Sequence, residues 1–577
     1  MFFDVESNVT STPLGTSEHT LRLGWAVHWT RPHGKHLERE DWQYFTTKAG
    51  FWDWVDAHAY ARTKTVIVAH NIIYDFMVCD GLHELPARGY TAEDLITGEG
   101  IQLYSYHRKT TTLQFIDSMN IFSFSLAKLG ADIGVPKIEC NPLTATDDEL
   151  IPYCKQDVNV LLQAFRQYLA FLRREDMGAF AVTRAGQAFN CYRHRFMRYD
   201  IHIHTREDVV ALERQSYYGG RVQCNFIGKS ADGPFYQLDV NAMYPFVMRH
   251  NPYPVLVHGP AHHNSLKALE NILERYLAIA HVTLQTDEPA YPVRRNSILI
   301  FPTGRFTTTL ATPELQYAQR KGHIVSVGDV TIYDHRYIFT EFVETLYQMR
   351  LRYKRQGNDT YGMFCKLFLN SLYGKFGQRS PEWETVGTAP LNMVDYRTVF
   401  DTKGNQWKEK TFGGLIQRAE STGNAWNAFV AVASHVTAYA RVLLYELCMF
   451  AGWENVYYTD TDCLIVNAIG YARLADRIDP DKLGYLKLEK SGDTLDIRAA
   501  KDYSFGGTDK RKGIPNKARV VGPDAWEVEI WPSLLGLTRA NHLSGYYTYA
   551  MTKRPKYEYT RGIVTSSGRT APFHLAE

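Results

Sequence analysis

Short apolar runs and longer helical stretches alternate along this chain. The runs TVIVAH at residues 65–70 and PFYQLDV at residues 234–240 are short and rich in β-formers, which predicts buried strands. Residues 362–377 predict a helix that ends at a glycine. Residues 425–453 form the longest apolar stretch, but they contain charged residues, which predicts a buried helix rather than a membrane span. The pattern as a whole indicates a mixed α/β fold.

An acidic turn is predicted near the C-terminal end of this pattern. Asn455–Tyr458 and Cys463–Asn467 are both rich in β-formers, and the string TDTD between them predicts two strands joined by a tight turn. The turn places Asp460 and Asp462 two residues apart. Taken alone it could be an ordinary polar turn, because Asp and Thr are common turn residues.

Asp239 supplies a second carboxylate at the end of a predicted strand. If that strand neighbours the acidic turn, Asp239 and Asp462 converge. Mg²⁺ prefers oxygen ligands and is usually held by one or two carboxylates together with phosphate oxygens. Two such ions can activate the attacking oxygen and stabilise the leaving oxygen of a phosphoryl displacement. We therefore predict a two-metal site; the alternative is two surface aspartates at strand ends.

The helix predicted at residues 362–377 carries a cationic face. Lys366, Asn370 and Tyr373 fall at i, i+4 and i+7 on one side, while mainly apolar residues occupy the opposite side. A lysine in this position can contact phosphates, and a tyrosine can stack on a base or sugar. The alternative is an ordinary amphipathic helix with a solvated lysine.

These three strings, in this order, resemble motifs A, B and C of the family B DNA polymerases. DVNAMYP at residues 239–245 resembles DxxSLYP, KLFLNSLYG at 366–374 resembles KxxxNSxYG, and YTDTDC at 458–463 resembles YxDTDS. KDY at residues 501–503 resembles a further family string, KxY. Three positions depart from the usual residues without removing a metal ligand or a charge: Ala242, Met243 and Cys463.

The resemblance implies a nucleotidyl-transfer site. Its implied metal ligands are Asp239, the Val240 carbonyl and Asp462, with Asp460 in a supporting part. Tyr244 would lie under the sugar and exclude a 2′-hydroxyl, which selects deoxynucleotides. The residues implied to contact the triphosphate and line the nucleotide pocket are Lys366, Asn370 and Tyr373. Lys501 and Tyr503 would hold the primer terminus.

A second acidic group begins at the N-terminus. FFDVE places Asp4 and Glu6 on one side of a strand, because side chains alternate with period two. Asp75 follows the apolar run at residues 65–70. Only three residues precede Asp4, so we expect an unusually short first strand; either the edge of this site is frayed, or the true start of the chain lies upstream.

A helix is predicted at residues 146–165, with Asp147 or Asp148 as its cap and a proline in its early turns. Tyr153 and Asp157 lie at i and i+4 on one face of this helix. Each acidic piece alone is typical of solvated charge. Together, four convergent carboxylates would form a second two-metal phosphodiester site.

Together these strings resemble the DxE, NxxxD and YxxxD motifs of the DnaQ-like 3′–5′ proofreading exonucleases, which precede the polymerase in family B. The implied metal ligands are Asp4, Glu6, Asp75 and Asp157, with Tyr153 orienting the attacking water. The residues implied to contact the frayed primer or support this site are His70, Asn71, Phe76, Ser118 and Lys137.

The string YYGGR at residues 217–221 lies between the two groups. It resembles the YxGG motif that links exonuclease and polymerase and contacts the template strand. The residues it implies for DNA binding are Tyr217, Gly219, Gly220 and Arg221. Glycines permit a close backbone approach, but a plain turn would explain them equally well.

Long gaps separate Asp239 from Lys366 and Lys366 from Asp460. Protein-primed polymerases of phages and linear mobile elements carry insertions at both places, and the chain resembles that subfamily. The first insertion binds the terminal protein, and the second is a hairpin that closes around DNA and confers strand displacement and processivity. A surface insertion without a partner is the alternative, because loop length alone predicts function poorly.

The resemblance implies a ribonuclease-H-like exonuclease domain followed by a right-hand polymerase with two insertions. The predicted segments are the exonuclease at 1–180, the palm at 181–250 and 425–525, the first insertion at 251–335, the fingers at 336–384, the second insertion at 385–424 and the thumb at 526–577.

Composition changes this picture little. The 577 residues are 45% hydrophobic, which supports several domains with substantial cores, and the net charge of +2 gives no overall signal for nucleic acid. Residues 551–577 hold five basic and two acidic side chains, which suits either a phosphate-contacting surface or a solvated tail. Eight cysteines without a CxxC pair and no visible signal peptide favour a reducing cytoplasm.

The leading hypothesis is a monomeric, template-directed, protein-primed and strand-displacing DNA polymerase with a proofreading exonuclease. It would use two Mg²⁺ or Mn²⁺ ions in each active site. The predicted partners are primer–template DNA, deoxynucleoside triphosphates and a terminal protein, with no membrane. The alternatives are a nucleic-acid-primed family B polymerase and a catalytically silent DNA-binding replication scaffold. A reverse transcriptase would lack both the exonuclease strings and the KxxxNSxYG helix.

Overall fold

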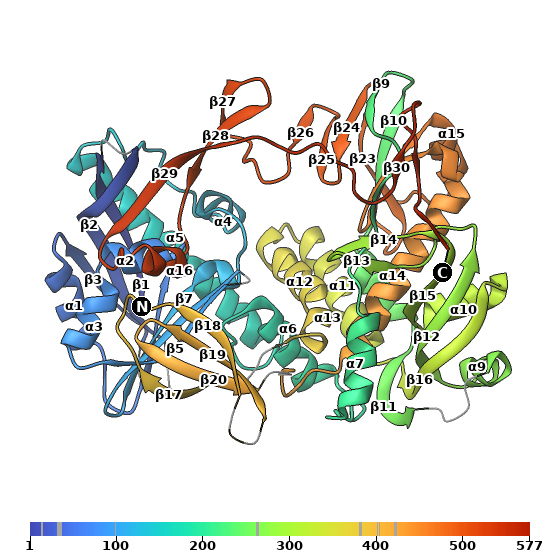
Figure 1. The fold of residues 1–577 in the computed structure, drawn as a ribbon. Coiled ribbons are helices and arrows are strands. Elements are labelled where there is room, and N and C mark those ends of the chain that lie inside the picture. The colour runs from blue at the N-terminus through green and yellow to red at the C-terminus, as the bar shows by residue number, and fades with distance from the viewer. Residues whose placement is uncertain are drawn as a thin grey trace.

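The computed structural model describes residues 1–12, 15–31, 37–98, 100–260, 265–379, 383–400, 402, 404–420 and 424–576. Figure 1 shows an N-terminal sheet domain on one side and a second sheet-based body, which holds the C-terminus, on the other. Between them lie the helices α11 (Thr340–Arg355), α12 (Asp359–Ser371) and α13 (Tyr373–Phe376).

The N-terminal domain is built on a mixed sheet in which β1 runs parallel to β4 and β4 runs parallel to β7. Its strands are β1 (Phe2–Ser11), β2 (Thr16–Thr30), β3 (Arg39–Phe45), β4 (Lys64–Ala69), β5 (Thr91–Gly98), β6 (Ile101–Arg108) and β7 (Thr111–Asp117). Its helices are α1 (Lys48–Ala57), α2 (Ile72–Val78), α3 (Gly81–Ala87), α4 (Leu126–Asp132) and α5 (Asp147–Arg174).

Strand β1 shows how the sheet is covered on both faces. Phe3 and Val5 lie in a core with residues of α1, α2 and α3, whereas Phe2 lies in a core with residues of α5. This alternation follows from the period-two geometry of a strand. Asp4 and Glu6 share the parity of Phe2 and therefore face α5. The expectation of a short first strand was wrong, because β1 has ten residues and is paired along its length with β2.

Helix α5 begins as predicted but is capped by a different residue. The helix runs from Asp147 to Arg174, and its N-cap is Thr146 rather than Asp147 or Asp148. The backbone N–H of Thr146 donates to a carboxylate oxygen of Glu149 at 2.8 Å. A Thr followed three residues later by Glu is the capping-box pattern, which places both aspartates inside the first turn, where their charge suits the helix dipole.

Part of the segment predicted to be the thumb, together with the end of the predicted palm segment, joins the N-terminal sheet. Strands β27 (Arg519–Gly522), β28 (Ala525–Ile530) and β29 (Tyr546–Lys553) extend that sheet, with β29 antiparallel to β2. Figure 1 shows these strands reaching across the top of the molecule to the N-terminal domain. Helix α16 (Leu534–Arg539) adds two leucines to the core that also contains Phe3.

A five-stranded antiparallel sheet carries the acidic turn in the second body. Its order is β23-β10-β22-β21-β8, with β8 (Val222–Cys224), β10 (Phe235–Val240), β21 (Val456–Asp460), β22 (Cys463–Asn467) and β23 (Leu486–Gly492). Helices α8 (Met243–His250), α14 (Val430–Ala451) and α15 (Ala468–Arg473) pack near it. Helix α14 lies within the apolar stretch at 425–453 and is largely buried, as predicted. Among the described helices, none has the length and apolar character needed to cross a membrane.

Both segments predicted as insertions form sheets of their own. The first contains β11 (Tyr253–Pro260), β12 (Leu277–Thr286), β13 (Val293–Arg295), β14 (Ile298–Ile300), β15 (Thr303–Ala311), β16 (Ile324–Arg336), α9 (Leu266–Leu273) and α10 (Thr312–Lys321). The second contains β17 (Glu384–Thr388), β18 (Asp395–Phe400), β19 (Gln406–Phe412) and β20 (Leu415–Glu420) in one antiparallel sheet. Residues 261–264, 401, 403 and 421–423 of these segments lie outside the described residues.

The remaining α-helices and strands are α6 (Arg184–Cys191), α7 (Glu207–Ser216), β9 (Gly228–Ser230), β24 (Leu495–Ala499), β25 (Asp502–Phe505), β26 (Thr508–Lys510), β30 (Ile563–Val564), β31 (Thr570–Ala571) and β32 (His574–Ala576). Strands β26, β25, β24 and β9 form a four-stranded antiparallel sheet in that order, and β30 pairs with β31. Strand β32 pairs in parallel with β15, so the end of the chain is attached to the first insertion segment.

Candidate active sites

The acidic turn brings Asp239 and Asp462 together. In the sheet, Asp239 is paired with Cys463, the residue after Asp462, and the Val240 N–H donates to the Asp462 carbonyl at 2.8 Å. Thr461 bridges the two aspartates of the turn in a left-handed conformation, at φ 66°. Burial, followed by the charge of Asp239, raises the pKa of Asp462 to about 6. Two half-buried carboxylates thus face each other at the end of β10.

Asp460 is held differently from its neighbour. Its carboxylate accepts from Lys501 Nζ at 2.7 and 2.9 Å and from the Tyr458 hydroxyl at 3.3 Å. The Lys501 backbone N–H also donates to the Tyr458 hydroxyl at 2.9 Å. Asp460 is therefore neutralised by a lysine, which leaves Asp239 and Asp462 as the carboxylates available to a cation. The other residue of the KxY string, Tyr503, is buried against Tyr458 with ring centroids 5.3 Å apart.

Helix α12 has the polar face that the sequence predicts. Lys366 and Asn370 are exposed, whereas Phe364 and Phe368 are buried, which is the division that the 3.6-residue period predicts. Just beyond the helix, the Tyr373 ring stacks on the Tyr244 ring with centroids 4.7 Å apart. The charge of Asp462 contributes to the raised pKa of both tyrosines after burial, which places the stacked pair beside the acidic turn.

The YYGGR segment packs against the acidic turn and is hydrogen-bonded to it. The Arg221 carbonyl accepts from the Thr461 N–H at 2.7 Å, and a Cβ at Gly220 would lie 2.9 Å from the Thr461 side chain. The prediction that Arg221 binds DNA was wrong, because its side chain is 1% exposed and bonded inside the protein. Gly219 is exposed and Tyr217 is half-buried.

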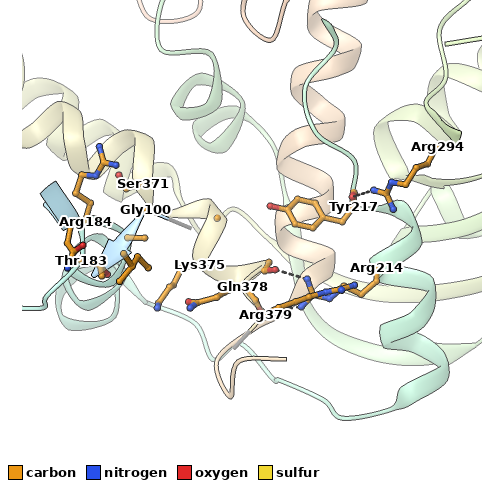
Figure 2. Close-up of a pocket in the computed structure, with 15 residues that line it drawn as sticks. Gly100, Thr183, Arg184, Arg214, Tyr217, Arg294, Ser371, Lys375, Gln378 and Arg379 are labelled. Atoms are coloured by element: carbon orange, nitrogen blue, oxygen red, sulfur yellow. Dashed lines mark hydrogen bonds between the residues drawn. The ribbon is translucent and has the colours of Figure 1, made fainter. Parts of the chain in front are cut away.

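A cationic cavity opens next to this segment (Figure 2). It has a volume of about 620 Å³ and is lined by parts of the N-terminal domain, α6, α7, β13 and the end of the α12–α13 region. Among the described residues that line it, none is acidic and five are basic: Arg184, Arg214, Arg294, Lys375 and Arg379. Figure 2 shows Arg184 and Lys375 on one side and Arg214 and Arg294 on the other.

Two arginines of this cavity donate to backbone carbonyls. Arg214 donates to the Gly377 carbonyl at 2.6 Å and the Gln378 carbonyl at 3.2 Å, and Arg294 donates to the Tyr217 carbonyl at 3.0 Å. Burial lowers the pKa of Lys375 and, with the charge of Arg379, that of Arg214 to about 10. The sequence reasoning missed all five residues, since they come from segments far apart in the chain.

The second acidic group also converges. Asp4 and Glu6 come from β1, Asp75 from α2 and Asp157 from α5, and the Val5 N–H donates to Asp75 Oδ1 at 3.2 Å. Burial, followed by the charges of Asp75, Asp157 and Glu6, raises the pKa of Asp4 well above its ordinary range. Burial, followed by the charge of Asp157, raises the pKa of Glu6 to about 7. The four carboxylates therefore lie close enough to disfavour each other's ionisation.

Lys137 and Tyr153 complete this group. Lys137 Nζ lies 2.6 Å from Asp157 Oδ2 and donates to the Tyr153 hydroxyl at 3.1 Å. Burial lowers the pKa of Lys137, but the charge of Asp157 and its hydrogen bonds raise it overall. The Cys154 thiol donates to the Asp4 carbonyl at 3.4 Å. Lys137 thus contacts both Tyr153 and Asp157, the two residues that the sequence places on one face of this helix.

Asp117 is a buried acidic residue that the sequence reasoning missed. Its carboxylate accepts from the backbone N–H groups of Asn71 and Ile72 at 3.1 and 3.2 Å, which anchors the start of α2. Asn71 has a left-handed φ of 69° at that point. The signal was available, because Asp117 is an acidic residue at the end of an apolar strand, directly before Ser118.

Two predicted DNA contacts are wrong. Phe76 is 1% exposed and packs on Tyr104 and Phe115 with ring centroids 5.1 and 5.3 Å apart, so it belongs to the core. Ser118 is fully buried, and its hydroxyl lies 2.8 Å from His70 Nδ1. Ser118 therefore orients His70 rather than a DNA strand, whereas Asn71 is exposed and His70 is half-buried.

The donor sets of both sites fit divalent cations. In the second group, Asp157 Oδ1 is buried and has no hydrogen-bond partner in the part of the chain that the structure describes. Ligand atoms of Asp4, Glu6 and Cys154 lie within 4.8 Å of one another. Carboxylate oxygens that are buried, mutually repulsive and unpartnered are what Mg²⁺ or Mn²⁺ would neutralise.

Mg²⁺ is expected to stabilise the protein more at about pH 8 than at about pH 5.5. The raised pKa values of Glu6 (about 7) and Asp462 (about 6) mean that the folded chain keeps protons that the unfolded chain has released. Without metal, the free energy of unfolding therefore falls as the pH rises from about 4 to about 7. Metal binding requires the ionised carboxylates and reverses this loss.

Thermal melts with and without Mg²⁺ across this pH range measure the effect. We expect the Mg²⁺-dependent gain in unfolding free energy to shrink by about 1.4 kcal/mol or more at the lower pH, which corresponds to a tenfold loss of affinity. An equal gain at both pH values would contradict the assignment of these carboxylates as metal ligands.

Comparison with known sequences identifies the family. A sequence model of DNA polymerase type B, organellar and viral, matches residues 137–448, more than half of the chain. The chain belongs to this family. The matched stretch includes Asp157, Asp239 and Lys366, whereas Asp4 and Asp462 lie outside it.

Two curated relatives show how far the similarity extends. The DNA-directed DNA polymerase of Enterobacteria phage PRD1 is 28% identical over 435 residues, which cover 71% of this chain and 69% of that protein. A probable DNA polymerase of Neurospora intermedia is 25% identical over 373 residues, which cover 59% of this chain and 36% of that protein. The aligned part therefore spans well under half of the fungal relative's length.

Solved structures of Phi29 DNA polymerase have the same fold. The orthorhombic crystal form superimposes with a TM-score of 0.67 at 15% identity, covering 96% of this chain and 100% of that one. Its complex with primer-template DNA and incoming nucleotide substrates gives a TM-score of 0.65 at 14% identity, with the same coverage. The expected mixed α/β, multidomain fold of a family B polymerase is thus confirmed.

Proposed function

We propose that this chain is a template-directed DNA polymerase with a 3′–5′ exonuclease in the same polypeptide. The observation that carries the proposal is the presence of two separate carboxylate sites on one family B fold. One is formed by Asp239 and Asp462, and the other is formed by four residues: Asp4, Glu6, Asp75 and Asp157.

In the polymerase site, Asp239, the Val240 carbonyl and Asp462 would hold the cations. When bound, two divalent cations would activate the primer 3′-hydroxyl and stabilise the leaving pyrophosphate oxygen. Lys501 keeps Asp460 neutralised and, with Tyr503, would hold the primer terminus. The exposed Lys366 would contact the triphosphate, with Asn370 beside it on α12. The Tyr244 ring, held by its stack on Tyr373, would lie under the sugar and exclude a 2′-hydroxyl.

The cationic cavity would take the template strand. Its five basic side chains carry positive charge without a carboxylate among the lining residues, which suits a phosphate backbone. It adjoins Tyr217, and Gly219 is exposed two residues later, so both residues would contact the template as it reaches the acidic turn.

In the exonuclease site, the four carboxylates would hold two cations around a phosphodiester. Tyr153, fixed by Lys137, would orient the attacking water through its hydroxyl. Asn71 and His70 would contact the frayed primer, with His70 oriented by the buried Ser118. Lys137 would also offset the charge that Asp157 adds to the site.

We further propose protein priming by a terminal protein. Two observations support it: the chain resembles protein-primed polymerases, and the gaps between its motifs hold two separate sheets at 251–335 and 385–424. The first would bind the terminal protein, and the second would close around DNA to confer strand displacement. The other proposed segments are the exonuclease at 1–180, palm at 181–250 and 425–525, fingers at 336–384 and thumb at 526–577. The protein would act as a monomer in the host cytoplasm.

A 5′-labelled primer annealed to a longer template tests the proposal. With Mg²⁺ and deoxynucleotides the primer should lengthen, and with Mg²⁺ alone it should shorten from its 3′ end. Failure to lengthen would refute the polymerase, and failure to shorten would refute the exonuclease. Transfer of a labelled deoxynucleotide onto a protein hydroxyl, in place of the primer, would then test protein priming.

A further inference from the structure

Two arginines are buried behind the polymerase site. Arg221 is 1% exposed and Arg441 is 2% exposed. Burying a guanidinium is costly unless its N–H groups are bonded and its charge is compensated. Neither side chain can reach DNA or nucleotide, so we ask which parts of the protein they bond to.

The Arg221 side chain is held by the first insertion segment. It donates to the carbonyl oxygens of Pro289 and Ala290 at 2.6 and 3.2 Å, and its guanidinium lies 3.7 Å from the centroid of the Phe301 ring. It also donates to Gln223 at 2.7 Å. Three of these four contacts come from residues 289–301, which are far from Arg221 in the sequence.

The Arg221 backbone holds the acidic turn. Its carbonyl accepts from the Thr461 N–H at 2.7 Å, and β8, which begins at the next residue, pairs Val222 with Asp460. Thr461 is the left-handed residue between Asp460 and Asp462, so this hydrogen bond fixes the point where the chain reverses. One residue thus touches the insertion with its side chain and the metal-site turn with its backbone.

Arg441 holds the backbone of Tyr218 and Gly219, just before Arg221 in the sequence. It donates from Nη1 to the carbonyls of Tyr218 and Gly219 at 2.8 and 3.0 Å, and it forms a fully buried ion pair with Glu314 at 2.9 Å. Glu314 belongs to α10 of the insertion segment. The loop at 218–221 is therefore bonded to the insertion through two arginines in succession.

We propose that Arg221 is a positioning residue for polymerisation, which couples the conformation of residues 289–301 to the Asp460–Asp462 turn. The proposal rests on the polymerase function proposed above. A partner or DNA segment that displaces residues 289–301 would alter nucleotide incorporation without touching the active site. Such a displacement would alter polymerisation but not 3′ degradation, because the Arg221 contacts lie outside the N-terminal domain that holds the second carboxylate group.

The test compares Arg221→Met, which keeps the stem and removes the guanidinium, with the native full-length chain. We expect kcat for nucleotide incorporation to fall by about 10- to 100-fold, because small displacements of metal-binding groups are costly. We expect the half-saturating Mg²⁺ concentration to rise severalfold, while KM for nucleotide changes little. Degradation of single-stranded DNA by the same preparation should stay within about twofold of the native rate.

Two further variants alter the insertion side and the acidic-turn side of the contacts made by Arg221. Phe301→Leu removes the ring from the insertion side, and Gly220→Ala places a Cβ against Thr461. Both should reproduce the split between polymerisation and degradation, even if Arg221→Met folds poorly. Arg166→Met is the matched control, since Arg166 lies over Trp29 in the N-terminal domain, and it should leave polymerisation unchanged.

The outcomes separate clearly. Native polymerase kinetics and Mg²⁺ requirement in Arg221→Met and Phe301→Leu would overturn the inference. An equal loss of both activities with a lowered melting temperature would overturn it too, because it would reveal a purely structural role. If the native chain fails to extend primers at all, the proposed function itself has failed.

Discussion

Replacing Asp462 by asparagine is expected to reduce primer extension by about 10³-fold or more. Asp462 lies beside Asp239, and burial followed by the Asp239 charge raises its pKa to about 6, so a bound cation would stabilise its ionised form. Asparagine keeps the size of the side chain but removes the charge that holds the metal. The loss corresponds to about 4 kcal/mol of transition-state stabilisation. Single-nucleotide incorporation with Mg²⁺ on a primed template measures it.

The exonuclease of the same variant provides the internal reference. Degradation of single-stranded DNA should stay near the native rate, because its carboxylates lie in the N-terminal domain. Asp481→Asn is the matched control, since Asp481 is exposed and paired with Lys354 away from the turn. Primer extension by Asp462→Asn at a rate within tenfold of the native protein would show that the metal is held elsewhere.

Replacing Asp4 and Glu6 together by alanine is expected to abolish degradation while primer extension persists. The two carboxylates supply the β1 side of the second carboxylate group. Burial is the main cause of their raised pKa values, followed by the charges of Asp75 and Asp157 for Asp4 and the charge of Asp157 for Glu6. Without them the remaining carboxylates cannot enclose two cations. We expect a loss of about 10³-fold in 3′ degradation. Net primer extension at low nucleotide concentration should rise, because the variant no longer removes nucleotides from the 3′ end of the growing primer.

Stability offers a second readout for this double variant. The buried carboxylates destabilise the metal-free protein at high pH, so their removal should not lower the melting temperature in a chelator at about pH 8. Asp147→Ala with Asp148→Ala is the matched control, because both are exposed at the start of the helix that carries Asp157. Retention of 3′ degradation in the Asp4/Glu6 variant would place the nuclease site elsewhere.

The placement of the individual carboxylates was predictable because it depends on local backbone geometry. Asp239 ends a strand, Asp462 follows a tight turn, and Asp4 and Glu6 share a strand face; each feature follows from the backbone period over a few residues. The cationic face of α12 was predictable for the same reason. Spacing along one element decides which side chains lie together, whatever surrounds the element.

Burial was the property that local reasoning misjudged. Arg221, Phe76 and Ser118 all occur in or beside strings that resemble DNA-binding motifs, yet all three are enclosed by segments distant in the sequence. The Arg221 guanidinium donates to the Pro289 and Ala290 carbonyls, and the sequence around residue 221 gives no sign of these partners. The basic cavity was hidden in the same way, because its five cations come from four distant segments and the net charge is only +2.

The chain's own pattern was sufficient for the α/β character and for the place of each carboxylate on its own strand, turn or helix, where backbone geometry dictates the result. The order of the two halves came from the resemblance to the family. Three other features depended on long-range packing: the attachment of β29 to the N-terminal sheet, the capture of Arg221 by the insertion, and the convergence of the cavity's arginines. Edge pairing, burial and charge clustering are set by which distant surfaces meet, and that choice minimises the free energy of the whole fold.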